Sequence, residues 1–183
     1  WIAIGGILTF LYSAPKIPIA ATSILRKIAI GKTIYLSFVW TYVTTVLPML
    51  MYGRPWTATE VLFTGSRFFL IYAICIIFDY RDREEDKKEG IRSMITYFNE
   101  TGINIIFYLS ILMFMISTIL LLWKGFSSLL VFILLMPGIL VLYLFPTAKK
   151  NTSDYFYLFA LDGLMMLASL ITFLLYQLHI SFR

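Results

Sequence analysis

Apolar runs of about 20 residues recur along this chain, and they constrain its fold more than any other feature. Such a run is the length that an α-helix needs to cross the hydrocarbon core of a bilayer. Complete runs fall at 33–52, 58–78, 102–122, 127–145 and 155–177, and a shorter one at 1–12. Each complete run predicts a membrane span, and the first run, with about half the required length, predicts a partial one.

The composition agrees with a membrane protein. Of the 183 residues, 60% are hydrophobic and 14% are charged, whereas a soluble domain has roughly 45–50% and about 25%. The runs are apolar throughout, not at every second position, and lipid offers the backbone no hydrogen-bond partner, so the spans are expected to be helices. The sequence predicts one all-α domain over residues 1–183, a polytopic transmembrane helical bundle. Because Trp1 opens the chain inside a half-length run, we expect the C-terminal part of a longer protein.

Most of the basic residues fall in three loops. The loops at 13–32, 79–101 and 146–154 carry eleven of the fifteen lysines and arginines. Cytoplasmic loops carry such an excess, so these three loops are expected to face the cytoplasm of a cell (inner) membrane, with the C-terminus on the opposite side. Loop anchors near anionic lipid account for the net charge of +5, and no nucleic-acid partner is needed to explain it.

Six of the ten acidic residues lie within residues 78–93, directly after a span. If the helix continues past the span, its period of 3.6 residues places Asp79, Asp82 and Asp86 within an arc of roughly 60°. A salt bridge from Asp79 to Arg83 is favourable at a spacing of four, whereas Asp82 and Asp86 repel each other at the same spacing. Carboxylates on one face suit Mg²⁺, which takes oxygen ligands. A magnesium site and a solvated helix end both remain open.

Two motifs resemble those of a known family. Asp79-x-x-Asp82-x-x-x-Asp86, followed by Gly90-Ile91-Arg92-Ser93, resembles the second aspartate-rich motif of the UbiA superfamily of intramembrane prenyltransferases. Tyr12-Ser13-Ala14-Pro15-Lys16 is similar to the YxxxK element that this family carries between its fourth and fifth helices. The resemblance implies a nine-helix fold of which the last six are present, while the family's first aspartate-rich motif lies outside this chain.

The resemblance also implies a reaction: transfer of an isoprenyl chain from isoprenyl diphosphate to a hydrophobic acceptor such as the ring of a quinone precursor, with Mg²⁺ as cofactor. It implies these roles: metal binding and catalysis by Asp79, Asp82 and Asp86, a catalytic hydroxyl from Tyr12, and diphosphate binding by Lys16 and Arg92. From the residues alone, two other roles stay open: Tyr12 could be an interfacial tyrosine, and Lys16 could be a topology anchor.

Two other functions remain open. The first is a catalytically silent relative that binds isoprenoid lipids or acts as a scaffold for a quinone-pathway complex. The second is a small-solute transporter, which is disfavoured because the polar residues cluster in a loop and not near the midplane, where transporter sites lie.

Two charged residues lie inside predicted spans, at a cost of about 2.5–3.5 kcal/mol each. At 1.5 Å per residue, Arg67 lies about 18 Å from the end of its span that carries Asp79, and Asp162 lies about 12 Å deep from the same side. An arginine side chain can bridge that difference in depth. We therefore expect a buried Arg67–Asp162 ion pair that fastens two spans together, with a direct substrate role for these residues as the alternative.

Overall fold

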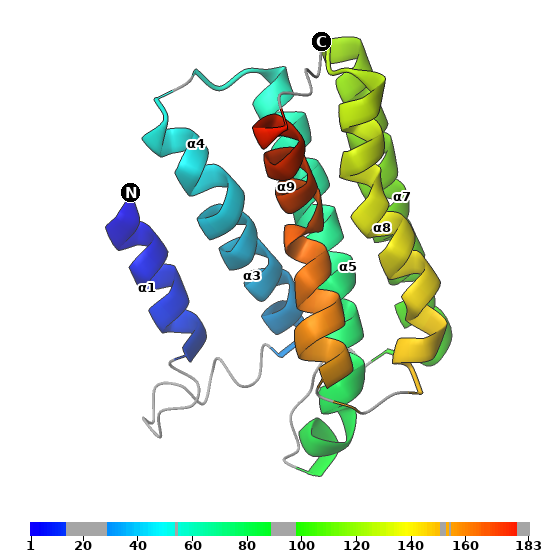
Figure 1. Ribbon diagram of the computed structural model, residues 1–183. Coiled ribbons are helices and arrows are strands. Elements are labelled where there is room, and N and C mark those ends of the chain that lie inside the picture. The colour runs from blue at the N-terminus through cyan, green and yellow to red at the C-terminus, as the bar shows by residue number, and fades with distance from the viewer. Residues whose placement is uncertain (14–28, 54, 89–97, 151–152, 154, 179–183) are drawn as a thin grey trace.

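A computed structural model of the chain describes residues 1–13, 29–53, 55–88, 98–150, 153 and 155–178. Within these residues the chain is helical and has no strand, and Figure 1 shows its helices side by side in a bundle. Five helices are long and apolar enough to cross a membrane, so the chain is a multi-pass membrane protein. They are Thr33–Met51, Ala58–Arg83, Glu100–Lys124, Ser128–Ala148 and Phe156–Gln177.

The five predicted spans are confirmed. In the first half of the bundle lie α1 (Ile2–Ser13), α3 (Ala29–Thr41), the π-helical η3 (Tyr42–Val46), α4 (Leu47–Met51) and α5 (Ala58–Lys88). In the second half lie α7 (Glu100–Ile119), the 3₁₀-helical η4 (Leu120–Lys124), α8 (Ser128–Ala148), the π-helical η5 (Phe156–Leu161) and α9 (Asp162–Gln177). The helix that differs most from its predicted span is α5, because it continues to Lys88, well past the apolar run at 58–78.

Local sequence signals set the helix ends around α7 and α8. The Asn99 side chain caps the start of α7 by accepting from the Gly102 N–H at 2.8 Å, and the Ser127 hydroxyl accepts from the Leu130 N–H at the start of α8. Gly125, with φ 88°, ends the segment before α8 in the left-handed conformation, which glycine adopts without steric cost. Polar caps and glycine therefore mark this turn between two apolar spans.

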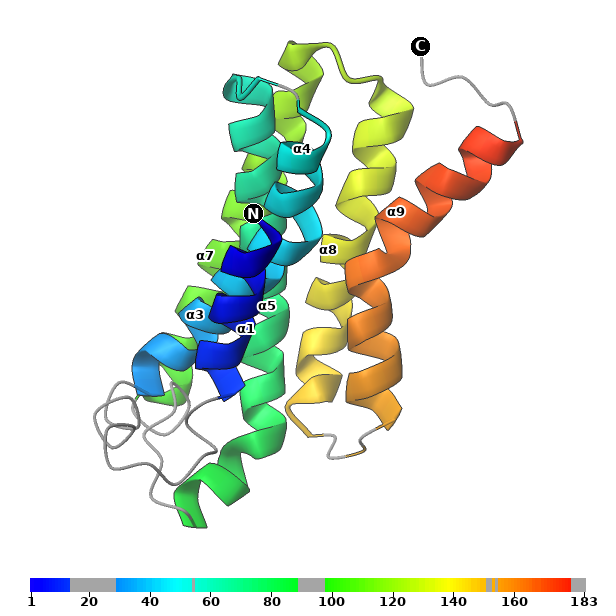
Figure 2. The same cartoon turned by 90° about the vertical axis from the view of Figure 1, so that its left-hand side faces the viewer.

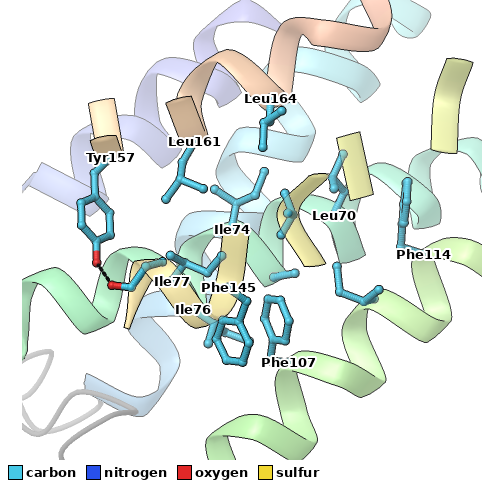
Figure 3. Close-up of a cluster of buried hydrophobic side chains, with 14 of the residues drawn as sticks. Leu70, Ile74, Ile76, Ile77, Phe107, Phe114, Phe145, Tyr157, Leu161 and Leu164 are labelled. Atoms are coloured by element: carbon cyan, nitrogen blue, oxygen red, sulfur yellow. Dashed lines mark hydrogen bonds between the residues drawn. The ribbon is translucent and has the colours of Figure 1, made fainter. Parts of the chain in front are cut away.

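The core surrounds α5, which packs most extensively against α7 and then against α3. Buried side chains of α5, among them Ile74 and Ile77, meet residues of α7, α8 and η5 (Figure 3). The Phe107 and Phe145 rings are stacked, with centroids 3.6 Å apart. The Tyr157 hydroxyl donates to the Ala148 carbonyl at 2.7 Å, the dashed line in Figure 3. The side chain of Tyr157 is fully buried, and this bond gives its hydroxyl group a hydrogen-bond partner.

Small polar residues line the contact between α3 and α5. Thr33, Ser37, Thr41 and Thr45 recur at every fourth position and are all buried. The Ser37 and Thr41 hydroxyls donate to the carbonyls four residues earlier, each at 2.7 Å. Such short side chains let two membrane helices approach closely, and α3 lies directly against α5.

The described residues that border the three basic loops lie at the same end of the bundle. Ser13, Ala29, the Lys88 end of α5 and the Ala148 end of α8 all lie there, as Figures 1 and 2 show. This arrangement agrees with three loops on one side of a membrane. That this side is the cytoplasm remains a prediction from the basic residues.

Candidate functional site

Helix α5 carries the acidic motif out of the apolar core. It runs unbroken from Ala58 to Lys88, so the helix continues past the span, as the spacing argument requires. Asp79, Asp82 and Asp86 therefore belong to one helix, at the end of the bundle where Ser13 lies. The side chain of Asp86 lies outside the described residues.

Asp79 is held at the contact between α5 and α3. It is only 8% exposed, and it accepts a hydrogen bond of 2.6 Å from the Thr33 hydroxyl. Thr33 is itself buried in the first span. A carboxylate that leaves water needs such donors, because burial without them is costly. The bond fixes the orientation of Asp79 at the start of the site.

Asp82 lies one turn further along α5 and has a cationic partner. The Arg81 Nε donates to the Asp82 Oδ1 at 2.8 Å, and the two side chains are 26% and 34% exposed. The Arg81 guanidinium also lies over the rings of Phe78 and Tyr157, at 5.3 and 5.6 Å from their centroids. Arg81 therefore joins α5 to η5 while it offsets the charge of Asp82.

The donor chemistry of these residues fits a hard divalent cation. Asp79 and Asp82 offer carboxylate oxygens, the ligands that Mg²⁺ prefers, and no described residue donates a hydrogen bond to the second oxygen of Asp82. Among the described side chains, no three acidic, histidine or cysteine groups converge on one point. A complete ligand set would therefore require Asp86, oxygens of the substrate, or both.

The other predicted site residues are Tyr12, Lys16 and Arg92, and the structure describes the side chain of none of them. Tyr12 belongs to the last turn of α1, and the C-terminal ends of α1 and α5 lie at the same end of the bundle (Figure 1). The side chain of Tyr12 is outside the described residues. Lys16 and Arg92 also lie outside them. Their roles stay predictions.

The ion pair predicted between Arg67 and Asp162 is not formed. Arg67 is 8% exposed, and its Nη2 donates to the Leu134 carbonyl at 3.4 Å. Its guanidinium lies over the rings of Phe63 and Phe114, at 5.2 and 5.7 Å. Its Nε has no hydrogen-bond partner in the described part of the chain. Arg67 thus joins α5 to α7 and α8 through aromatic rings and a carbonyl.

The reason for this correction is the direction of the two side chains. The similar depths of Arg67 and Asp162 in the membrane were compatible with an ion pair, but the Arg67 side chain points toward α7 and α8. Asp162 is exposed, whereas Leu161, Leu164 and Ala168 form the buried side of the last span. At 100° per residue, Asp162 lies on the far side of α9 from that stripe.

A pocket lies on a different part of α5. It has a volume of about 390 Å³ and lies between α3 and η3 on one side and the half of α5 away from Asp79 on the other, with Phe38, Tyr42, Gly65 and Phe68 in its lining. Its exposed lining is apolar, and ligand pockets are of this size and kind. Its lining supplies no acid, base or metal ligand.

The sequence analysis missed two residues of the site. Thr33 could have been found, because Thr33, Ser37, Thr41 and Thr45 form a regular polar stripe in an otherwise apolar span. Arg81 gave no such signal, because adjacent residues on a helix point in different directions and are not expected to pair.

Removing the Thr33 hydroxyl tests the link to Asp79. We expect Thr33→Val to destabilise the chain by about 1–3 kcal/mol, because a buried carboxylate loses a donor. Thermal unfolding in detergent micelles measures the change. Thr44→Val is the matched control, because the Thr44 hydroxyl is exposed and bonds only to the Trp40 carbonyl of its own helix. Equal melting temperatures for the two variants would contradict a structural role for the Thr33–Asp79 bond.

Comparisons of the chain with family models, with curated proteins and with solved structures give no match.

Proposed function

We propose that this chain is an integral-membrane prenyltransferase of the UbiA type, which moves an isoprenyl chain from its diphosphate to a hydrophobic acceptor. The observation that carries the proposal is the course of α5, which leaves the apolar core with Asp79 and Asp82 one turn apart and extends through Asp86. The motif resemblance supplies the reaction class, and the five membrane-length helices supply the apolar surroundings.

The chain's own residues would divide the work as follows. Asp79 and Asp82, with Asp86, would hold Mg²⁺, and Thr33 would keep the Asp79 carboxylate oriented through its hydrogen bond. When bound, Mg²⁺ would neutralise the diphosphate and make it a better leaving group. Lys16 and Arg92 would add positive charge for the diphosphate, and Tyr12 would add a hydroxyl donor.

An apolar environment suits the isoprenyl chain and the cation that forms when the diphosphate leaves. Aromatic side chains of α5 and η5 pack together next to Asp79 and Asp82, among them Phe78 and Tyr157. Water that reached an allylic cation would consume it, so exclusion of water protects the transfer. Aromatic ring faces would also stabilise such a cation, by roughly 0.5–2 kcal/mol each.

One observation favours the second candidate, a catalytically silent relative that binds isoprenoid lipids. Asp82 is already paired with Arg81, and such a pair reduces the net negative charge that draws a divalent cation. The apolar pocket beside η3 would still accommodate a lipid chain. This candidate retains lipid binding and lacks metal-dependent chemistry.

Metal removal separates the two candidates. Membranes that contain the protein are incubated with a radiolabelled isoprenyl diphosphate, with Mg²⁺ or with a chelator, beside membranes that lack the protein. We expect Mg²⁺-dependent appearance of label in an acceptor, lowered on the order of 100-fold or more by the chelator. Binding of the labelled compound without transfer in either condition would support the silent relative.

A further inference from the structure

Arg81 is within reach of two carboxylates, which come from different helices. Its Nε donates to the Asp82 Oδ1 at 2.8 Å, and its guanidinium lies 5.6 Å from the centre of the Tyr157 ring. The Asp162 N–H bonds to the Tyr157 carbonyl, so Asp162 lies one helical turn further along the element that Arg81 contacts. Asp162 is also within electrostatic range of Arg81. The Arg81 cation therefore has one carboxylate in contact and a second at longer range.

The Asp162 carboxylate has no hydrogen bond or ion pair of its own among the residues that the structure describes. It lies six residues into the span that begins at Phe156, which is about 9 Å at the rise of an α-helix. A carboxylate at such a depth is costly in lipid, and those that occur pair with an opposite charge or face water. A closer approach of Arg81 would therefore stabilise Asp162.

A divalent cation at Asp82 would compete with Arg81. Two positive charges on one carboxylate repel each other, so the guanidinium would have to leave Asp82 as the metal binds. Arg81 is partly buried, and a buried charge that loses its partner is destabilising. A guanidinium has several N–H donors on a long side chain, so it can turn toward Asp162 while it stays beside the Tyr157 ring.

We propose that Asp162 is a positioning residue for the cation site, and that it accepts Arg81 when a metal ion takes Asp82. Without metal, Arg81 stays on Asp82 and neutralises it. With metal, Arg81 pairs with Asp162, and the Asp82 carboxylate is left to the metal. The role in metal binding rests on the proposed function, whereas the exchange of Arg81 between two carboxylates does not.

The exchange can be tested without metal. Asp82→Asn removes the charge that holds Arg81, as a bound metal would. We expect Asp162→Asn to lower the melting temperature in micelles by about 2–4 °C more in the Asp82→Asn background than in the parent chain, because Arg81 then depends on Asp162. When Arg81→Gln is also present, this extra loss should disappear. Equal losses with and without the Asp82 carboxylate would overturn the proposal.

Mn²⁺ binding, followed by electron paramagnetic resonance, tests the consequence for the metal. We expect Asp162→Asn to weaken Mn²⁺ binding on the order of 5-fold or more, and Asp162→Glu to retain most of the binding. In the Arg81→Gln background, Asp162→Asn should leave Mn²⁺ binding unchanged, because no cation has to be accepted. A loss that persists without Arg81 would show that Asp162 acts on the metal directly, and would overturn the proposal.

Failure of this inference and failure of the metal site give different results. A parent chain that binds no Mn²⁺ would overturn the metal site and, with it, the role of Asp162 there. Mn²⁺ binding that depends on Asp82 but not on Asp162 would overturn the role of Asp162 alone. Ser169→Ala is the matched control, because Ser169 is an exposed residue of the same helix, and it should change neither Mn²⁺ binding nor the melting temperature.

Discussion

Replacing Gly138 by alanine is expected to destabilise the chain by about 1–3 kcal/mol, the usual cost of overpacking a filled core. A Cβ at Gly138 would lie 2.1 Å from the Phe114 Cε1 and 2.6 Å from its Cδ1. The Phe114 ring has no free space into which to move, because it is 0% exposed and lies beneath the Arg67 guanidinium. A methyl group on α8 would therefore displace the Phe114 ring of α7 and, with it, the Arg67 side chain of α5.

Gly65→Ala is the matched control for this substitution. Gly65 also lies inside a membrane helix, but a Cβ there would meet no described atom within 4 Å. In a helix interior, alanine is favoured over glycine by roughly 0.5–1 kcal/mol, so this variant should be as stable as the parent or more so. Thermal unfolding in micelles gives both values, and circular dichroism at low temperature checks that helix content is unchanged.

A double substitution identifies the contact responsible. Adding Phe114→Leu to Gly138→Ala removes the clashing ring, so the two changes should cost less together than the sum of their separate costs. Additive costs would show that the Gly138 Cβ acts elsewhere. Equal effects of Gly138→Ala and Gly65→Ala would show that α8 shifts freely, contrary to the close packing of Gly138 against Phe114.

The arrangement of spans was predictable because it depends on length and hydropathy, two properties that sequence displays directly. The prediction placed the first span at 33–52, and the structure has it at Thr33–Met51. The continuation of the helix beyond its apolar run was only a condition of the spacing argument, and α5 meets it by running to Lys88. Acid–base pairs four residues apart support a helix in water. The residues at which a membrane helix begins and ends therefore follow from the local amino-acid composition.

The directions of side chains were not predictable in the same way. The predicted Arg67–Asp162 ion pair was compatible with the estimated depths of the two residues in the membrane. It does not form because α5 and α9 direct these side chains toward different neighbours. The π-helical η5 lies directly before Asp162, and the Asp162 N–H bonds to the Tyr157 and Phe159 carbonyls. A π turn holds about one residue more than an α turn and so rotates the residues that follow it. No sequence pattern marked η5.

Arg67 shows how a buried charge can be accommodated without an opposite charge. The rings of Phe63 and Phe114 offer their negative faces, and the Leu134 carbonyl accepts a hydrogen bond. Each ring contributes on the order of 1–2 kcal/mol when the cation is desolvated. The sequence shows the arginine and the phenylalanines, but their meeting depends on the register between three helices.

The Asp82→Asn variant is expected to lose Mg²⁺-dependent transfer on the order of 100-fold or more, because an amide is a weaker metal ligand than a carboxylate and carries no charge. Asparagine keeps the shape of the side chain, so the Arg81 contact can persist as a neutral hydrogen bond. Transfer is followed with a radiolabelled isoprenyl diphosphate, and Mn²⁺ binding by electron paramagnetic resonance provides a readout independent of turnover.

The control removes a carboxylate from the same end of the bundle but not from α5. Glu100 begins α7 and pairs with Lys149, so Glu100→Gln should retain both transfer and Mn²⁺ binding. Arg81→Gln separates the two candidate functions further: releasing Asp82 from its cation should strengthen Mn²⁺ binding if Asp82 is a ligand, since an opposing charge is removed. Transfer that is unchanged in Asp82→Asn would reject the site. Mn²⁺ binding that is absent from the parent and from Arg81→Gln would leave the acidic face as a solvated helix end, and the chain as a lipid-binding relative.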